Sequence, residues 1–255
     1  MASTKREREL AARKQQARWE AKQAKARQRR QLVAAVVAGA MVLALVSTAL
    51  ILGLTTHDTP SAAGQTQTQT ASPGPSPSPT FTLPDPSAAE GRTWTSTIST
   101  SAGAITVQLD GKAAPQAVAS FVSLARGGFF DGTPCHRLTT SGIFVLQCGD
   151  PTGTGTGGPG YSFGPIENAP PDDVYTAGTL AMARQPNNGE SMGSQFFVVY
   201  KDSTIPSDAA GGYTVFGRIT SGLDIVQAVA DAGVADGSSD GSPATPVTIE
   251  GVDTK

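Results

Sequence analysis

Residues that carry most catalytic and metal chemistry are scarce in this sequence. Its 255 residues include two histidines and two cysteines, and they lack the C-x-x-C or H-x-x-x-H spacing of a metal site. We therefore expect no metal. His57 lies in a proline-rich stretch, which leaves His136 as the only candidate general base, so a Ser-His-Asp hydrolase is not expected. Residues 153–158 match G-x-G-x-x-G, but Pro159 and Gly160 follow where a phosphate-binding helix would begin, so we expect a surface loop and no cofactor.

Charge is divided unevenly along the chain. Residues 1–31 contain eleven Lys/Arg and three Glu, a net charge of +8, whereas residues 55–255 contain eight Lys/Arg and eighteen Asp/Glu, a net charge of −10. Between them, residues 32–54 form a stretch of 23 residues without a charge. As a helix this stretch would be about 35 Å long, enough to cross the roughly 30 Å hydrocarbon core of a bilayer. We expect one uncleaved transmembrane helix at 32–54.

The charged flank predicts the orientation of this span. A basic flank favours the cytoplasmic side, so residues 1–31 are expected in the cytoplasm and the residues after 54 outside it. A cleaved signal peptide is less favoured, because about 30 residues precede the apolar stretch and no clear A-x-A site closes it. We expect the basic segment to signal topology and to attract anionic lipid head groups, in preference to binding nucleic acid.

A linker is predicted next. Residues 55–91 are poor in apolar side chains and contain seven prolines, together with the strings QTQTQT and SPGPSPSP. Such a composition cannot bury enough surface to fold and predicts a disordered spacer. The remaining residues, 92–255, have the length of one domain, which we expect to be monomeric and held outside the cytoplasm at the cell membrane.

Short strands and two separated helices are predicted within residues 92–255. The strands alternate apolar and polar residues, and the helices combine an apolar face with proline or glycine at their ends. We expect strands at 105–109, 196–200, 213–219 and 247–252, and helices at 115–126 and 223–232. This pattern indicates a mainly β fold, a barrel or sandwich with helical caps.

Residues 134–150 (PCHRLTTSGIFVLQCGD) are predicted to form a β-hairpin. Residues 135–138 and 143–147 are strand-like, and residues 139–142 are typical of a turn. The hairpin would bring Arg137, Phe144 and Gln147 to one surface. A guanidinium, an aromatic ring and an amide suit the binding of a peptide backbone beside an apolar side chain, and they suit nucleophilic chemistry poorly.

Two cysteines flank this hairpin. In an oxidising compartment, Cys135 and Cys148 could form a cross-strand disulfide worth about 3 kcal/mol for a loop of about 15 residues. Strand alternation argues against it, because Cys135 shares the face of Arg137 whereas Cys148 lies on the face opposite Gln147. The sulfurs would then diverge unless a bulge intervened. The sequence leaves both a disulfide and two buried thiols open.

The hairpin also carries a family resemblance. The residues His136-Arg137, Phe144, Gln147 and Gly149-Asp150 are similar to the catalytic hairpin of cyclophilins, the peptidyl-prolyl cis–trans isomerases. The similarity continues in the family's order through LAMA at 180–183, GSQFF at 193–197 and VFG at 215–217, and it covers residues 92–255. The resemblance implies a closed antiparallel β-barrel of about eight strands capped by two helices. It also implies a membrane-anchored bacterial type of isomerase that needs no cofactor.

The resemblance further implies roles for single residues. Arg137 would be the catalytic arginine, Phe144 a wall of the proline pocket and Gln147 a backbone-binding amide. The other positions implied to bind substrate are Val145, Ala183, Arg184, Gln195, Phe197, Ile205 and Tyr213. Rotation about an X-Pro bond must overcome a barrier of about 20 kcal/mol. The proline nitrogen gains a lone pair in the twisted state, so an arginine N–H that donates to it would stabilise the transition state.

Several positions depart from the family pattern. The spacing between Arg137 and Gln147 is longer than usual, which places extra length in residues 139–142. Val145 stands where methionine is common, and Arg184 stands where asparagine is common and would add charge beside the groove. Ile205 replaces a tryptophan, and Tyr213 takes the place of a histidine. Because that tryptophan contributes to cyclosporin binding in the family, we expect weak cyclosporin sensitivity.

Two functions fit these residues. The first is a membrane-tethered isomerase that acts on proline-containing polypeptides and helps exported proteins fold. The second is a proline-peptide-binding or chaperone module that keeps the groove but has little turnover. The substitutions at Val145, Arg184 and Ile205 favour the second, and the retained Arg137 and Gln147 favour the first.

Overall fold

A computed structural model describes residues 81–255. Within this range, no helix has both the length and the hydrophobicity needed to cross a bilayer. The basic segment at 1–31, the span predicted at 32–54 and most of the linker predicted at 55–91 lie outside the described residues.

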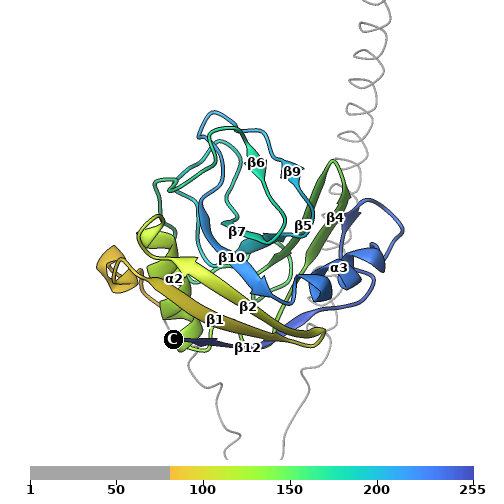
Figure 1. The fold of residues 1–255 in the computed structure, drawn as a ribbon, viewed down its shortest axis with the longest axis horizontal. Coiled ribbons are helices and arrows are strands. Elements are labelled where there is room, and N and C mark those ends of the chain that lie inside the picture. The colour runs from red at the N-terminus through yellow and green to blue at the C-terminus, as the bar shows by residue number, and fades with distance from the viewer. Residues whose placement is uncertain (1–80) are drawn as a thin grey trace, which may run out of the picture. The chain divides into compact units, whose positions relative to one another are not determined.

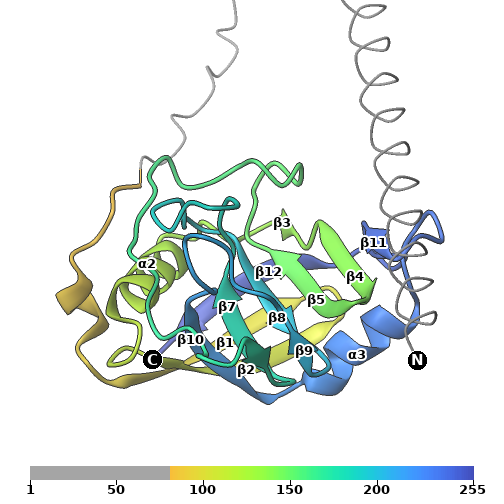
Figure 2. The same cartoon turned by 90° about the horizontal axis from the view of Figure 1, so that it is seen from above.

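One curled antiparallel sheet makes up most of the domain (Figures 1 and 2). Ten strands follow one another in the order β11-β4-β5-β8-β7-β10-β2-β1-β12-β3, and β6 pairs with β9 separately. Their bounds are β1 Thr93–Thr100, β2 Gly103–Asp110, β3 Thr133–Pro134, β4 Arg137–Ser141, β5 Ile143–Cys148, β6 Val174–Tyr175, β7 Thr179–Met182, β8 Phe196–Val199, β9 Ser203–Thr204, β10 Val215–Ser221, β11 Asp240–Gly241 and β12 Thr248–Thr254. The prediction of a mainly β domain is confirmed.

The prediction of a closed, eight-stranded barrel is wrong in detail, because the ladder of strand pairs does not close. The sheet ends at β3 on one side and at β11 on the other, and each of these strands has only two residues. The chain passes from β3 to β4 through Cys135 and His136, which lie outside any strand. The Cys135 N–H still donates to the Val247 carbonyl at 2.8 Å. The chain itself therefore connects the last strand on one side, β3, to β4, the strand beside β11 on the other side. A closed barrel would have a row of hydrogen bonds there.

Two α-helices lie on opposite sides of the curled sheet in both views (Figures 1 and 2). Helix α2 spans Pro115–Arg126 and α3 spans Leu223–Asp231, within one residue of the predicted bounds. Pro115 suits the first turn of α2, where a backbone N–H is not needed. The apolar face of α2 is buried against the sheet, with Phe121 packed edge-on against Phe196 at a ring-centroid distance of 5.6 Å.

The folded domain begins before Arg92. Residues 86–89 form a 3-10 helix, η1, and Ala89 is fully buried. The indole Nε1–H of Trp94 donates to the Ala89 carbonyl at 2.9 Å, and Phe81 packs edge-on against Phe129. Composition alone placed the end of the linker too late, because prolines and small residues suit a packed 3-10 turn as well as a linker.

Strands β5, β7 and β8 are buried on both faces, and this arrangement creates the floor of the site. Their inner side chains, such as Leu146 and Phe196, belong to the main core. Their outer side chains join a second, smaller apolar cluster of Val145, Tyr175, Ala181, Phe197, Val199 and Ile205. This outer cluster underlies a groove on the surface of the sheet.

Candidate active site

The hairpin of β4 and β5 sets the register of the site. Arg137 on β4 lies directly opposite Gln147 on β5. The strands pair as far as Ser141 and Ile143, and only Gly142, with a φ of 78°, forms the tip. The turn predicted at 139–142 is therefore wrong. The additional residues lengthen both strands, which leaves Arg137 and Gln147 side by side at the base of the hairpin.

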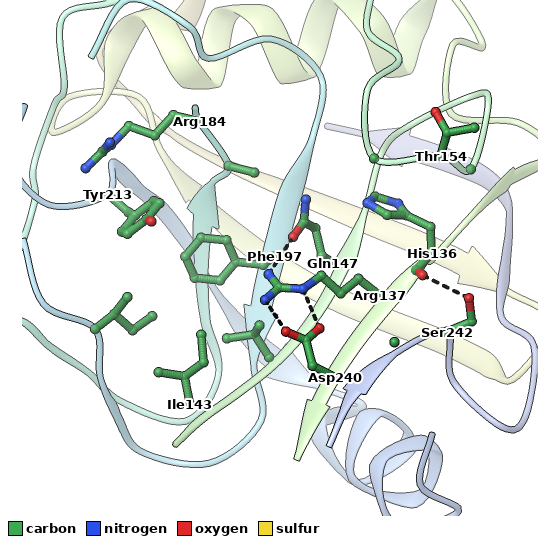
Figure 3. Close-up of a pocket in the computed structure, with 16 residues that line it drawn as sticks. His136, Arg137, Ile143, Gln147, Thr154, Arg184, Phe197, Tyr213, Asp240 and Ser242 are labelled. Carbon is green, nitrogen blue, oxygen red and sulfur yellow. Dashed lines mark hydrogen bonds and ion pairs between the residues drawn. The ribbon is translucent and has the colours of Figure 1, made fainter. Parts of the chain in front are cut away.

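A groove of about 520 Å³ runs beside this pair (Figure 3). Eight of the ten residues predicted to be catalytic or substrate-binding line it: Arg137, Val145, Gln147, Ala183, Arg184, Phe197, Ile205 and Tyr213. Gln195 lines a second cavity of about 350 Å³, which shares Gln147 and Ala183 with the groove. The structure thus brings together residues from three strands, β4, β5 and β8, and from the loops at 183–195 and 205–214.

One side of the groove is a continuous row of polar groups. The Asp240 carboxylate accepts from Arg137 at Nε (2.7 Å) and at Nη2 (2.8 Å). Arg137 Nη1 donates to Gln147 Oε1 at 3.4 Å, and Gln147 Nε2 donates to Gln195 Oε1 at 2.9 Å. Gln195 Nε2 in turn donates to the Gly157 carbonyl at 2.8 Å. The row orients each side chain through the next, with Gln147 at its centre and Arg137 between Gln147 and Asp240.

The other side of the groove is apolar and aromatic. Phe197 and Tyr213 pack edge to face at a ring-centroid distance of 5.5 Å. Val145 and Ile205 are buried beside them in the outer cluster, and Ile143 packs against it. A proline ring fits such a wall, because the wall offers apolar contact beside the row of polar groups.

Phe144 does not line the groove, contrary to its predicted role. Successive side chains of β5 alternate between faces, so Ile143, Val145 and Gln147 face the groove while Phe144 faces away. Phe144 packs against the main core and lies edge-on to Tyr200 at 5.9 Å. Ile143, which the sequence did not single out, takes the place in the wall.

Arg184 is buried and neutralised, so it does not add free charge beside the groove as predicted. Its side chain is 1% exposed and forms a bidentate ion pair with Asp208, with one contact at 2.8 Å. The remaining N–H groups donate to the carbonyls of Gln185, Gly211 and Gly212. The guanidinium also lies 4.6 Å from the ring centroid of Tyr213. Arg184 therefore ties the loop before Tyr213 to the end of β7.

The ionisation of the site is fixed by these contacts. Hydrogen bonding to Asp240 raises the pKa of Arg137, and the same bonds lower the pKa of Asp240, so both remain charged at neutral pH. Burial lowers the pKa of His136, which also lines the groove. Arg137 is therefore the charged hydrogen-bond donor of this edge, and a neutral His136 adds no second positive charge beside it.

Cys135 and Cys148 form a disulfide. The argument from strand alternation fails because Cys135 precedes β4 and its backbone turns toward β12. Its side chain is therefore free of the alternation that governs Arg137. The bond joins the chain just before β4 to the last residue of β5 and so fastens the base of the hairpin.

Other chemistries find little support in the described range. Within residues 81–255, no three His, Cys, Asp or Glu residues cluster as a metal site. Residues 189–193 match the G-x-S-x-G spacing, but Ser191 lies in a loop with no helix after it. Its hydroxyl donates to the Asn188 carbonyl and accepts from the Gln185 N–H, so it is not presented as a nucleophile. Residues 153–158 likewise form a loop, which lines the groove and the second cavity.

Sequence analysis missed two features of the groove. Asp240, the partner of Arg137, lies 103 residues away in a Gly/Ser-rich loop without any recognisable motif. His136 was treated only as a possible base, whereas the structure uses it as a wall beside Ser242, whose hydroxyl donates to the His136 carbonyl. No local pattern in the sequence indicates either contact.

Comparisons with known proteins agree with this geometry. The family model described as "Cyclophilin type peptidyl-prolyl cis-trans isomerase/CLD" matches residues 95–254. A probable peptidyl-prolyl cis-trans isomerase B of Mycobacterium tuberculosis is 50% identical over 165 residues, which cover 60% of this chain and 52% of the relative. Peptidyl-prolyl cis-trans isomerase B of Bacillus subtilis is 40% identical over 130 residues, covering 51% of this chain and 85% of the relative. The chain thus spans about half the length of the mycobacterial relatives it matches.

Solved structures give the same result. A cyclophilin-type peptidyl-prolyl cis-trans isomerase of Cryptosporidium parvum superposes with a TM-score of 0.54 at 27% identity, covering 64% of this chain and 98% of that one. The same protein solved in the presence of the dipeptide Ala-Pro gives a TM-score of 0.52 at 29% identity, covering 62% and 96%. With a family model that matches most of the chain, and with Arg137, Gln147, Gln195 and Phe197 gathered at one site, this chain belongs to the cyclophilin-type peptidyl-prolyl cis–trans isomerase family.

Proposed function

We propose that this chain is a peptidyl-prolyl cis–trans isomerase that acts on proline-containing polypeptides. The observation that carries the proposal is the placement of Arg137 and Gln147 in the same groove as the Phe197 and Tyr213 rings (Figure 3), with Gln195 bonded to Gln147. Relatives at 40–50% identity are named as such isomerases, and a structural neighbour was solved with Ala-Pro.

The geometry supports catalysis by differential binding. The wall of Phe197, Ile205 and Tyr213 would hold the proline ring, and Gln147 and Gln195 would bind the backbone beside it. The described residues occupy three of the five Arg137 N–H groups, which leaves two for a bound peptide. One of them would donate to the proline nitrogen, which accepts a hydrogen bond only when the amide is twisted. Such a bond stabilises the transition state more than either planar ground state.

The test measures how fast the full chain interconverts the cis and trans forms of a short proline peptide. NMR exchange spectroscopy gives this exchange rate directly. Wild type should accelerate the exchange, and Arg137→Ala should lose at least about 100-fold of that acceleration. Arg218→Ala, an exposed arginine on β10 away from the groove, serves as the matched control. Equal rates for wild type and Arg137→Ala would exclude the proposed mechanism. Peptide-induced shifts without exchange would instead establish a binding module.

We further propose that the enzyme is anchored in a membrane with this domain outside the cytoplasm. The uncharged stretch at 32–54 and the basic segment before it support the anchor, and the Cys135–Cys148 bond is typical of proteins in oxidising compartments. Protease added to intact cells should remove the domain, and permeabilisation should not be required. Protection of the domain until the cells are opened would place it in the cytoplasm.

A further inference from the structure

Asp240 contacts the guanidinium of Arg137 along its Nε–Nη2 edge, and its side chain lies at the rim of the same groove (Figure 3). Both of its carboxylate oxygens accept, one from Nε at 2.7 Å and one from Nη2 at 2.8 Å. This side-on, two-point contact fixes the plane of the guanidinium as well as its position. It leaves Nη1 directed to Gln147 and into the groove.

The carboxylate is itself fixed by the fold. Asp240 belongs to β11, which pairs with β4 so that Asp240 lies opposite Thr139. The Ser238 hydroxyl donates to the Asp240 carbonyl at 3.0 Å, and Asp236 accepts from the Ser238 N–H at 2.9 Å. The pairing of β11 with β4 therefore places the carboxylate before any peptide arrives, whereas the Asp236 bond lies within the preceding loop and does not reach the Asp240 side chain.

The exposure of this ion pair argues against a role in stability. The Arg137 side chain is 40% exposed and that of Asp240 is 53% exposed. Pairs this open to water contribute little to folding, because solvent screens them. The same contact has a large effect on geometry, because an arginine side chain without it can adopt many rotamers and few of them direct Nη1 toward the groove.

We propose that Asp240 is a positioning residue of the isomerase, one that acts through Arg137 by orienting its guanidinium for the twisted transition state. The inference rests on the proposed function. Because the orientation matters most when the proline nitrogen becomes an acceptor, loss of Asp240 lowers kcat and leaves KM nearly unchanged. Peptide affinity depends chiefly on the apolar wall and on the amides of Gln147 and Gln195, which Asp240 does not contact.

The experiment compares the full-length wild type with Asp240→Ala, Asp240→Asn and Asp240→Glu. The expected kcat of Asp240→Ala is about 10-fold below that of wild type, with KM changed less than about 2-fold. Asp240→Asn keeps one acceptor, so its kcat should lie between those of wild type and Asp240→Ala. Asp240→Glu restores a bidentate carboxylate, so its kcat should be higher than that of Asp240→Ala. Asp236→Ala is the matched control, because it removes a hydrogen bond of the same loop but no contact with Arg137.

An NMR signal separates orientation from loop structure. The Arg137 Nε–H resonance should be sharp and slow to exchange in wild type and in Asp236→Ala, and it should broaden in Asp240→Ala. Unchanged or increased kcat in Asp240→Ala would overturn the inference, as would an equal loss in Asp236→Ala. A wild type without any turnover would overturn the proposed function and this inference with it, whereas an active wild type beside an equally active Asp240→Ala would overturn this inference alone.

Discussion

Arg184 permits a quantitative test of how the groove is held together, because it is a charged side chain with only 1% of its surface exposed. Its five N–H groups donate to both oxygens of Asp208 and to the carbonyls of Gln185, Gly211 and Gly212. Arg184→Met keeps the length of the side chain and removes every one of these donors. Removing one partner of a fully buried ion pair costs about 3–5 kcal/mol. Because the Asp208 side chain left behind is 28% exposed, we expect the lower end, a loss of about 3 kcal/mol in the free energy of unfolding.

Arg184→Lys separates the charge from the shape of the guanidinium. A lysine keeps the positive charge but cannot form the two-point contact with Asp208 and reach Gly212 at the same time. We expect a loss of about 2 kcal/mol, intermediate between wild type and the methionine variant. Arg218→Met is the control, because an exposed arginine on β10 should change stability by no more than about 0.5 kcal/mol.

Urea unfolding followed by tryptophan fluorescence suits this measurement, because Trp94 is fully buried. The pair also predicts an acid dependence. Bonds from Arg184 hold the pKa of Asp208 well below its ordinary value of 3.8, so its contribution is present above that pH and is lost as the pH falls through the lowered pKa. The free energy of unfolding of Arg184→Met should lack this acid-sensitive contribution. A methionine variant within about 1 kcal/mol of wild type at neutral pH would refute the argument that the buried pair secures the loop before Tyr213.

Other outcomes follow from the site and its supports. Reduction of the disulfide, or Cys135→Ser, should lower the free energy of unfolding by about 3 kcal/mol for a sequence separation of 13, measured by chemical unfolding with and without reductant. Phe144→Ala should lower the free energy of unfolding by about 2 kcal/mol and leave kcat/KM of the folded enzyme unchanged. Phe197→Ala should remove most of the turnover. An equal loss of turnover in the two variants would place Phe144 in the site. The rate should stay constant from neutral pH to about pH 4 and fall below it, because Arg137 lowers the pKa of Asp240; a decline near pH 6 would contradict this. Cyclosporin should inhibit weakly, since the family's tryptophan is absent, and nanomolar inhibition in the peptide assay would contradict that expectation.

Those elements whose ends are marked locally could be predicted from the sequence. Helix α2 begins at a proline and ends before Gly127, and its apolar residues recur at helical spacing, so its bounds agree within a residue. Strand β1 was missed although it pairs along its length with β2 and also with β12. Its buried positions alternate correctly, but two of the four are Ser96 and Thr100, so hydrophobicity alone does not show the period.

Contacts between distant segments could not be predicted in this way. Asp240 reaches Arg137 only because the two-residue strand β11 pairs with β4 across 103 residues of sequence. Aspartate in a Gly/Ser-rich loop is common, and nothing nearby marks this one. The disulfide was left undecided for a related reason. The alternation argument assumed one continuous strand from Cys135, and the chain breaks that strand at His136 to remain bonded to β12.

The position of Phe144 shows why matching a string of residues is weaker than counting along a strand. Gln147 is fixed opposite Arg137 by the ladder, so the side chains that share its face are those at even separations from it on β5. Val145 and Ile143 satisfy this rule and line the groove, whereas Phe144, at an odd separation, faces the core. A longer hairpin tip leaves this parity unchanged, because the added residues lie beyond the pair that sets the register. The divergent tip is therefore compatible with an intact site, and the groove depends on the few positions counted from Gln147.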